Sequence, residues 1–391
     1  MKRLSLPSIL CGLCVTAAFA VFGHPSPAAA QTCDGIGDGT WNGCRGTGCQ
    51  VCPEKVAGYD CYFINHPECV QNTSCGGLFY DCDAACPPPT EADICGNTNG
   101  DGDSMSDALE DELLWRFAPV VRLHPNDSYR PSSADWYMAR THMRFHHTGC
   151  GDDQILNKGQ ITTNNIDLQA HQNKNGWPGC SHNSTWQYSD MRTPNSRFFL
   201  QIPNDSAEGT TRLGAPSSDW TCYAHVRYAP GSTSQYDIQY WFFYPYNGAL
   251  MAGQGGHEGD WEHITVRVWN DGTSLSQIYF ASHDTEGQWF QPWQVSFTAD
   301  DRPIVYSAVN SHASYPSPGT WVRNNLPDDH TADGGPVWDC RRGVWNVGER
   351  GLPLNKGRYW LNYSGRWGEI GTAFSGPWGP AYNQNNYWNV N

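Results

Sequence analysis

Ten of the chain's 16 cysteines crowd into one short segment, and this is the strongest constraint on how the chain can fold. They are Cys33, Cys44, Cys49, Cys52, Cys61, Cys69, Cys75, Cys82, Cys86 and Cys95. The segment has few aliphatic side chains, so it cannot bury an ordinary core and needs covalent or metal cross-links. Zinc is one reading, because Cys49 and Cys52 have a ligand-like spacing. Disulfides are the other, and export of the chain favours them, although the spacing leaves their connectivity open.

The N-terminus has the pattern of an export signal. Lys2 and Arg3 precede an apolar stretch from about Leu10 to Phe22, and three alanines at 28–30 offer a cleavage site before Gln31. The stretch is too short to span a bilayer. We therefore expect a signal peptide at 1–30, a secreted protein without a transmembrane segment, and 14 cysteines in the mature chain.

The rest of the chain is typical of an all-β protein. The full sequence is rich in aromatic residues (13%) and in turn formers, with 41 Gly and 26 Pro, whereas only 16% of the residues are charged. This composition excludes coiled coils, helical bundles and collagen. Strands are expected at 236–244, 263–269, 277–283 and 303–309, with a hairpin turn at 270–272.

These features predict a β-sandwich main domain at 113–391, with long loops and few short helices. A small disulfide-rich segment at 31–96 precedes it, and residues 97–112 form a linker. At least one disulfide is expected among the late cysteines, which are Cys150, Cys180, Cys222 and Cys340.

The formal net charge of −15 bears on the partners. A chain this acidic lacks the basic surface that nucleic acid requires, and anionic lipid would weakly repel it. Cations are the natural partners.

The linker contains a candidate calcium loop. Oxygen donors fall at loop positions one, three, five, nine and twelve, which is EF-hand spacing. They are Asn99, Asp101, Asp103, Asp107 and Glu110. Ser104 stands where an EF-hand has glycine, so the loop is closer to short aspartate-rich calcium loops. Its expected role is to stiffen the joint between the two parts, and the alternative is a solvated acidic linker that caps a helix at 108–117.

A second polar cluster lies at 255–263, where a glycine-rich loop enters a strand. Side chains alternate along a strand, so Asp260 and Glu262 share the apolar face of Ile264. Buried carboxylates are costly unless they are paired or coordinated. His257 can add a neutral nitrogen, and such a set suits Mg²⁺, Ca²⁺ or Mn²⁺ better than structural zinc. The alternative is an ion-paired network with Arg267 or a nearby lysine.

Two further histidines follow the ends of expected strands, so they can gather at one rim. His283 ends the strand at 277–283, and His312 follows the strand at 303–309. They are the candidates for a general base if the protein is a hydrolase. No nucleophile elbow, phosphate loop, dinucleotide fingerprint or HExxH helix is present in the sequence.

From about residue 114 to the C-terminus, the chain resembles the vacuolar protein sorting-associated protein 62 family. The matching segments are Phe117–Pro125, Tyr129–Trp136, His257–Arg267, Pro303–Ser307, Ser311–Gly319, Trp360–Tyr363 and Arg366–Gly368. The cysteine-rich segment lies outside this resemblance.

The heptapeptide Gly256–Glu262 is similar to the GHRHDWE motif of the necrosis- and ethylene-inducing-peptide-like cytolysins. That resemblance implies a β-sandwich with a divalent cation in an acidic cavity that attaches to sphingolipid sugar headgroups. It also implies that His257, Asp260 and Glu262 are cation ligands and places Asn247 at the position of a ligating aspartate. Glu258 and Gly259 replace the arginine and second histidine of the motif. The asparagine removes one negative charge from the site.

Three functions follow from these patterns. The first is a secreted protein that uses a divalent cation, Ca²⁺ or Mg²⁺, to recognise a glycan or glycolipid headgroup. The second is a metal-dependent hydrolase of phosphodiester or glycosidic bonds, with the same ion activating a water. The third is an extracellular structural protein whose metal stiffens a loop. The sequence leaves catalysis, the ligand and the oligomeric state open.

Overall fold

The computed structural model describes residues 105–147, 151–169, 197–248, 256–283, 286–323, 327–348, 359–371 and 374–383. The expected signal peptide at 1–30 and the cysteine-rich segment at 31–96 lie outside these residues. So do Cys150 and Cys180. Within the described ranges, no helix is long and apolar enough to cross a membrane.

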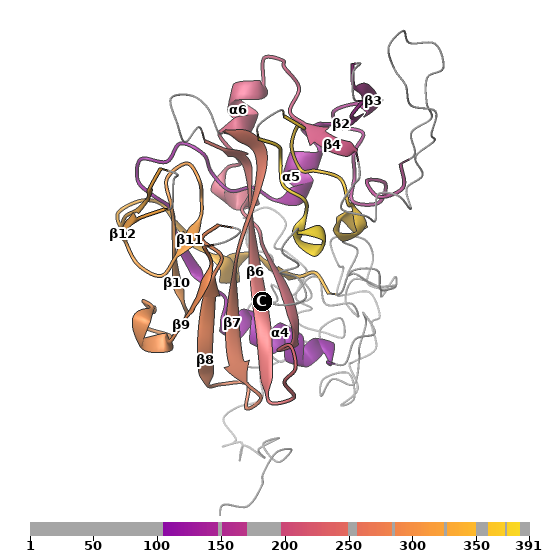
Figure 1. Cartoon of the computed structure of the whole chain (residues 1–391). Coiled ribbons are helices and arrows are strands. Elements are labelled where there is room, and N and C mark those ends of the chain that lie inside the picture. Colours follow the sequence, from indigo (N-terminus) through magenta and orange to yellow (C-terminus); the bar gives the residue numbers. More distant parts are fainter. Residues whose placement is uncertain are drawn as a thin grey trace, which may run out of the picture.

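A six-stranded sheet forms the centre of the molecule (Figure 1). Its order is β15 (Val344–Asn346), β5 (Cys222–Tyr228), β6 (Gln235–Asn247), β7 (His257–Trp269), β8 (Leu275–Phe280) and β9 (Gln288–Phe290). The 13-residue strands β6 and β7 are antiparallel and stay in register from Gln235 opposite Trp269 to Asn247 opposite His257. Ten consecutive residues of β6, 236–245, are buried, so this strand is covered on both faces.

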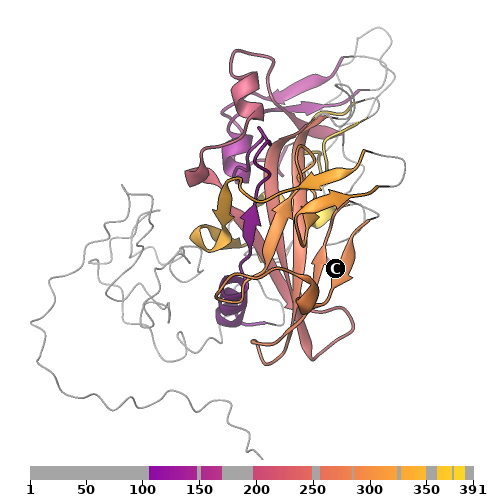
Figure 2. The same cartoon turned by 90° about the vertical axis from the view of Figure 1, so that its left-hand side faces the viewer.

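Each face of the central sheet packs against a smaller sheet (Figures 1 and 2). One consists of β11 (Ser314–Tyr315), β10 (Ile304–Ser307), β1 (Val120–Arg122) and β14 (Val337–Asp339). The other consists of β3 (Asp153–Leu156), β2 (His142–Phe145) and β4 (Phe198–Gln201). A separate ladder pairs β12 (Gly319–Trp321) with β13 (Asp329–Thr331).

Two apolar cores result from this layering. In the first, Tyr240, Phe242 and Ile264 of the central sheet pack with Val121 and Val305 of the four-stranded sheet. The second core lies on the opposite face of the central sheet. There Trp241, Phe243 and Trp261 pack with residues of the three-stranded sheet and of the C-terminal turns, which include Trp360, Trp367, Phe145 and Leu200.

Helices are few and short in the described part of the chain. The α-helices are α4 (Asp107–Arg116), α5 (Ala134–Met138) and α6 (Glu208–Arg212). The 3₁₀ turns are η3 (Ser217–Asp219), η4 (Pro292–Gln294), η5 (Cys340–Arg342), η6 (Tyr359–Asn362) and η7 (Pro380–Tyr382). The expected all-β class with few short helices is therefore confirmed here.

The expected local elements also agree with the structure. The four predicted strands correspond to β6, β7, β8 and β10, and β6 and β7 are longer than the sequence pattern indicated. The predicted helix at 108–117 corresponds to α4, whose N-cap Ser106 accepts a hydrogen bond from the backbone of Leu109. Gly272 in the predicted β7–β8 turn has a φ of 67°, which glycine adopts without strain.

The expected disulfide among the late cysteines joins Cys222 to Cys340 across 118 residues. Cys222 begins β5 of the central sheet, whereas Cys340 follows β14 of the four-stranded sheet. The bond therefore ties the two sheets that enclose the first core.

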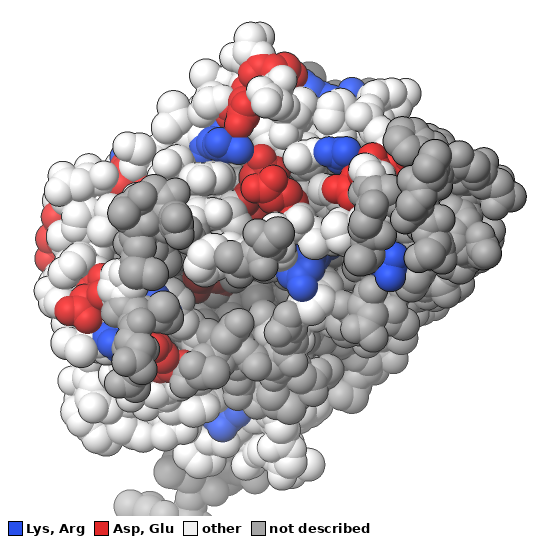
Figure 3. Space-filling model, turned by 45° about the horizontal axis from the view of Figure 1, so that its top comes forward, with Lys and Arg blue, Asp and Glu red and all other residues white. Residues whose placement is uncertain are grey.

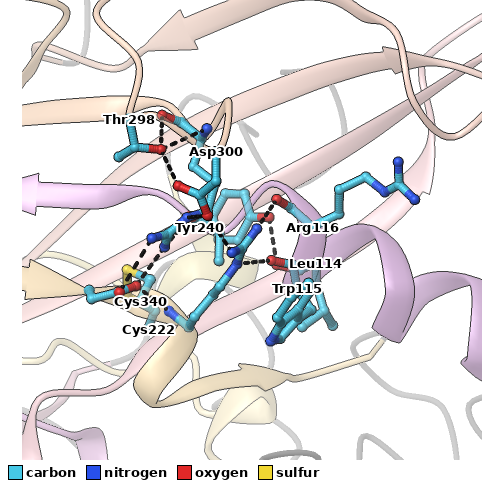
Figure 4. A network of polar contacts seen from close by, with 12 residues as sticks. Leu114, Trp115, Arg116, Cys222, Tyr240, Thr298, Asp300 and Cys340 are labelled. Carbon is cyan, nitrogen blue, oxygen red and sulfur yellow. Dashed lines mark hydrogen bonds and ion pairs between the residues drawn. A yellow bond between two sulfur atoms is a disulfide. The ribbon is translucent and has the colours of Figure 1, made fainter. Parts of the chain in front are cut away.

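The disulfide lies beside a polar network that holds the C-terminus of α4 (Figure 4). Arg341 donates to the carbonyls of Trp115 (3.0 Å) and Arg116 (2.9 Å) and to Asp300 (2.6 Å). The Tyr240 hydroxyl donates to the carbonyl of Leu114 at 2.8 Å. The Arg341 cation and the Tyr240 hydroxyl at this end satisfy carbonyls that a helix leaves without partners.

We expect Arg341→Ala to lower the free energy of unfolding by about 2–3 kcal/mol, because it removes charge-assisted bonds at a half-buried position. Arg116→Ala is the control. The Arg116 side chain contacts Glu112 in an exposed pair, which contributes about 0.5 kcal/mol or less. Urea denaturation measures both, and equal losses would show that Arg341 does not clamp the helix.

Candidate functional site

The ends of β6 and β7 next to α6 carry the polar residues that the sequence singled out. The register places Asn247 opposite His257, Tyr244 opposite Asp260 and Phe242 opposite Glu262. Asn247, Asp260 and Glu262 are all buried. The sequence prediction that Asp260 and Glu262 face inward is confirmed, and the hairpin brings Asn247 to the same end.

Asp260 is the centre of the hydrogen bonds at this end. Its Oδ2 lies 2.8 Å from Nδ1 of His312 and 3.2 Å from Nδ2 of Asn247. The Asn247 amide also donates to the carbonyl of Ser311 at 3.3 Å. Because an ionised carboxylate accepts only, the His312 Nδ1 carries the proton in this contact. The structure thus joins a predicted metal ligand to a predicted catalytic histidine.

His312 is enclosed on all sides. Its ring stacks on Tyr244 with the centroids 3.9 Å apart, and its Nε2 lies 3.5 Å from Oδ2 of Asp127. It is only 1% exposed. A ligand outside the protein therefore cannot reach this imidazole while the described residues keep these positions.

His283 reaches a different carboxylate. Its Nε2 lies 2.5 Å from Oδ2 of Asp329, and its side chain is 19% exposed. Asp329 also accepts from the hydroxyls of Ser311 and Tyr315, both at 2.7 Å. Burial acts to raise the pKa of Asp329, but these hydrogen bonds and the His283 charge outweigh it and hold that pKa below its usual value. Ser311 connects this cluster to His312, so the two histidines lie in neighbouring networks, as their positions after strands predicted.

His257 is half-buried, and its ring is fixed by the backbone. Its Nδ1 lies 2.8 Å from the carbonyl of Gly259, which makes Nδ1–H the donor and leaves the lone pair on Nε2. Such an outer hydrogen bond is typical of metal-ligating histidines.

The alternative of an ion-paired network does not involve Arg267. Arg267 forms a bidentate pair with Asp237 at 2.7 and 2.9 Å, further along the hairpin. Within the described residues, no three His, Cys, Asp or Glu side chains form a group that could hold a metal ion.

Glu258 is a buried carboxyl whose role sequence reasoning missed. It is 1% exposed, and it accepts from the backbone N–H of Ile202 at 2.8 Å and from Arg212 at 3.3 Å. Burial, aided by Glu369, raises the pKa of Glu258 to about 7, although the Ile202 N–H and Arg212 act in the opposite direction.

Gly259 separates the contacts of Glu258 from those of Asp260. Its φ is 67°, and a Cβ at this position would lie 1.9 Å from the carbonyl oxygen of Trp367. Only glycine fits at this position.

Arg212 contacts both Glu258 and the ring of Tyr246, which in turn packs against Tyr129. The guanidinium lies 4.9 Å from the ring of Tyr246, whose centroid is 5.0 Å from that of Tyr129. Both tyrosines are partly exposed. Figure 3 shows that the surface at this end carries acidic and basic side chains side by side.

Most of the predicted calcium loop lies outside the described residues. Asn99, Asp101 and Asp103 are not described, and Asp107 is the first residue of α4. Glu110 is buried and accepts from the side-chain amide of Asn346 at 2.6 Å, so this carboxylate contacts the edge of the central sheet.

Asp127 and Asp329 also contact this end of the molecule, and the sequence pattern did not predict them. Asp127 lies between two segments of the family resemblance, a position that could have drawn attention to it. Nothing in the local sequence of Asp329 points to a site. Asp127 contacts Asn310 across 183 positions of the chain, and Asp329 contacts Ser311 across 18.

Residues 181–369 match the family model described as vacuolar protein sorting-associated protein 62. The protein of that name from Saccharomyces cerevisiae is 23% identical over 288 residues, which are 64% of this chain and 58% of the relative. This chain is similar to that family. The putative vacuolar protein sorting-associated protein TDA6 of the same yeast is 23% identical over 290 residues, with the same shares of the two chains. The chain thus spans 58% of the length of these relatives, and the resemblance seen in the motifs is confirmed.

Structures of the second family named from the motifs are among the structural neighbours. NLPPya in complex with glucosamine is 10% identical, with 75% of this chain and 98% of that chain covered and a TM-score of 0.34. Necrosis and ethylene inducing protein 2, from the agent of witches' broom disease of cocoa, is 13% identical, with 68% and 89% covered and a TM-score of 0.31. At these values the likeness does not indicate what this chain binds.

The raised pKa of Glu258 predicts a pH dependence of stability. The folded protein keeps this proton up to about pH 7, whereas the unfolded chain releases it near pH 4.5. The contribution of Glu258 to the free energy of unfolding should therefore fall as the pH rises through this window, by up to about 3 kcal/mol.

Urea denaturation with EDTA from pH 4.5 to 7.5 tests this by comparing the wild type with Glu258→Gln. The stability difference, wild type minus variant, should decrease with pH. The exposed Glu112→Gln is the control for the general effect of removing one carboxyl group. A constant difference for Glu258→Gln would contradict the prediction.

Proposed function

We propose that the β6–β7 end binds a divalent cation, Ca²⁺ or Mg²⁺, and presents it to a glycan or glycolipid headgroup outside the cell. One observation carries the proposal. The Asn247 side-chain oxygen is buried and has no hydrogen-bond partner among the described residues, and Asn247 itself is 7% exposed. An unpartnered buried carbonyl is costly, and a cation beside Asp260 would satisfy it.

The donor chemistry supports this choice. Both hydrogen bonds to Asp260 fall on Oδ2, so its Oδ1 is available to an ion. Glu262 lies two residues further along the same face of β7, and His257 offers Nε2. Oxygen donors with one imidazole suit Ca²⁺ or Mg²⁺, which keep water in the remaining positions.

When bound, the ion would supply positions that sugar hydroxyls can occupy in place of water. Asn247 and Asp260 would hold the ion at this end of the hairpin. His257 and Glu262 would have to turn toward it, because no three such side chains are grouped for a metal ion in the described residues.

Aromatic rings would complete the ligand site. Tyr129 and Tyr246 are partly exposed and lie beside Gly248 and Gly256, where an added Cβ would meet their rings or hydroxyls. A sugar ring can stack on such tyrosines, while its hydroxyls reach the ion.

The expected export signal at 1–30 and the net charge of −15 favour a role in a calcium-rich exterior, where weak calcium sites are occupied. The calcium loop at 99–110 is proposed as a separate, structural site.

The hydrolase alternative has one observation in its favour. Asp329 orients the partly exposed His283, as a carboxylate orients a general base. His312 is less suited to that role because its ring is buried.

Cation binding is tested by thermal melts of the full chain with EDTA, Ca²⁺ or Mg²⁺. Asp101→Ala and Asp103→Ala, present throughout, silence the predicted calcium loop. At about 100 times the dissociation constant, the ion adds about 2.7 kcal/mol, so the melting temperature should rise by several degrees. Asp260→Asn should abolish the rise.

Asp153→Asn is the matched control, because Asp153 is also buried against a histidine, His147, at 2.9 Å. It should keep the full rise. A rise that persists in Asp260→Asn would place the ion elsewhere, and no rise in the parent would leave the structural role as the better account.

Ligand recognition is tested by retention on immobilised neutral glycans and on vesicles with glycosylated sphingolipids, with Ca²⁺ or with EDTA. Tyr246→Ala should weaken retention about five- to tenfold, and EDTA should abolish it. Trp293→Ala is the control, since Trp293 is 81% exposed on η4 after β9. Equal losses in both variants would indicate nonspecific aromatic adsorption.

A further inference from the structure

A strained turn lies against the proposed cation site. In residues 310–312, Asn310 has a φ of 67° and His312 a φ of 57°. Left-handed backbone is costly for residues other than glycine and persists only where the surroundings hold it. Two buried aspartates, Asp127 and Asp329, provide that support.

Asp127 holds the first residue of the turn. Its Oδ2 accepts from the backbone N–H of Asn310 at 2.9 Å, and its Oδ1 accepts from that of Tyr129 at 2.8 Å. The carbonyl of Asn310 in turn accepts from the N–H of Gly248 at 2.8 Å. The turn is thereby joined to the end of β6.

Asp329 holds the second residue of the turn. Its Oδ1 accepts from the Ser311 hydroxyl at 2.7 Å, while Tyr315 and His283 bind its other oxygen. Ser311 is fully buried, so no water competes for this bond. The carboxylate therefore anchors the turn through Ser311.

The 310–312 turn determines which side-chain oxygens of Asn247 and Asp260 are available to coordinate a cation. The Ser311 carbonyl accepts from Nδ2 of Asn247, which fixes the orientation of the amide and leaves Oδ1 as the free atom. The His312 Nδ1–H binds Oδ2 of Asp260 and leaves Oδ1 for coordination. If the turn were displaced, the Asn247 amide could rotate and Asp260 would lose its hydrogen bond from His312.

We propose that Asp127 and Asp329 are positioning residues that hold the 310–312 turn, and through it the oxygen atoms of Asn247 and Asp260 that face the cation. The role in cation binding rests on the proposed function. The anchoring of His312 can be measured without any cation.

Ser311→Ala and Tyr315→Phe form a matched pair for the test. Each removes one 2.7 Å hydroxyl bond to Asp329, but only Ser311 belongs to the turn. Two readouts on the full chain are compared: the Ca²⁺ affinity by calorimetry, with the loop at 99–110 silenced as above, and the His312 imidazole resonances of ¹⁵N-histidine-labelled protein in EDTA.

Ser311→Ala should weaken Ca²⁺ about five- to tenfold and shift the His312 signals. Tyr315→Phe should change the affinity less than twofold and leave these signals in place, with a similar loss of melting temperature. Asp127→Asn, which keeps only one side-chain acceptor for two N–H donors, should also shift the His312 signals.

Equal effects of Ser311→Ala and Tyr315→Phe on both readouts would overturn the proposal, and so would unshifted His312 signals in Ser311→Ala. If the parent protein binds no Ca²⁺, the proposed function fails separately. The His312 signals then still decide whether the two aspartates hold the turn.

Discussion

The pairing of β6 with β7 is the constraint on which the rest of the structure depends. Two 13-residue strands in continuous register form the middle of a sheet that is buried on both faces. Their aromatic side chains supply both cores, with Tyr240 and Phe242 on one side and Trp241 and Trp261 on the other. Because a one-residue slip would exchange the two faces, this packing fixes the register. The register in turn places Asn247, His257 and Asp260 at one end of the hairpin.

That end of the hairpin contains several buried carboxyl groups. Three buried carboxyl groups there are stabilised in different ways. Asp260 is hydrogen-bonded to His312 and Asn247, and Asp329 to two hydroxyls and His283. Glu258 keeps its proton to about pH 7, because burial raises its pKa. Each arrangement reduces the cost of removing a charge from water. Asp237, with its bidentate arginine, shows the ordinary structural solution on the same hairpin. The contrast is what makes the β6–β7 end a candidate site.

Local chemistry made much of this predictable. Alternation and aromatic runs located β6, β7, β8 and β10, and a serine before an acidic stretch preceded α4. The alternation also placed Asp260 on an inward face, and the strand ends suggested that His312 and His283 could approach one rim. The sequence pattern did not predict the contacts that depend on the backbone conformation of a single residue. Nor did it predict contacts between residues that meet only in the folded chain. Gly259 separates the contacts of Glu258 from those of Asp260, and Asp127 and Asp329 meet the 310–312 turn only in the folded chain.

The amino-acid sequence by itself determined the β class, the long central strands, the late disulfide partners as a set, and the residue types that can bind a cation. These follow from side-chain periodicity and chemistry, which act over a few residues. Tertiary structure alone decided that Cys222 pairs with Cys340, that Arg341 caps α4, and that Asp127 and Asp329 support the turn beside Asp260. Most of these contacts join residues more than a hundred positions apart, and the bond between Ser311 and Asp329 spans 18. They depend on how buried layers pack, which no local pattern encodes.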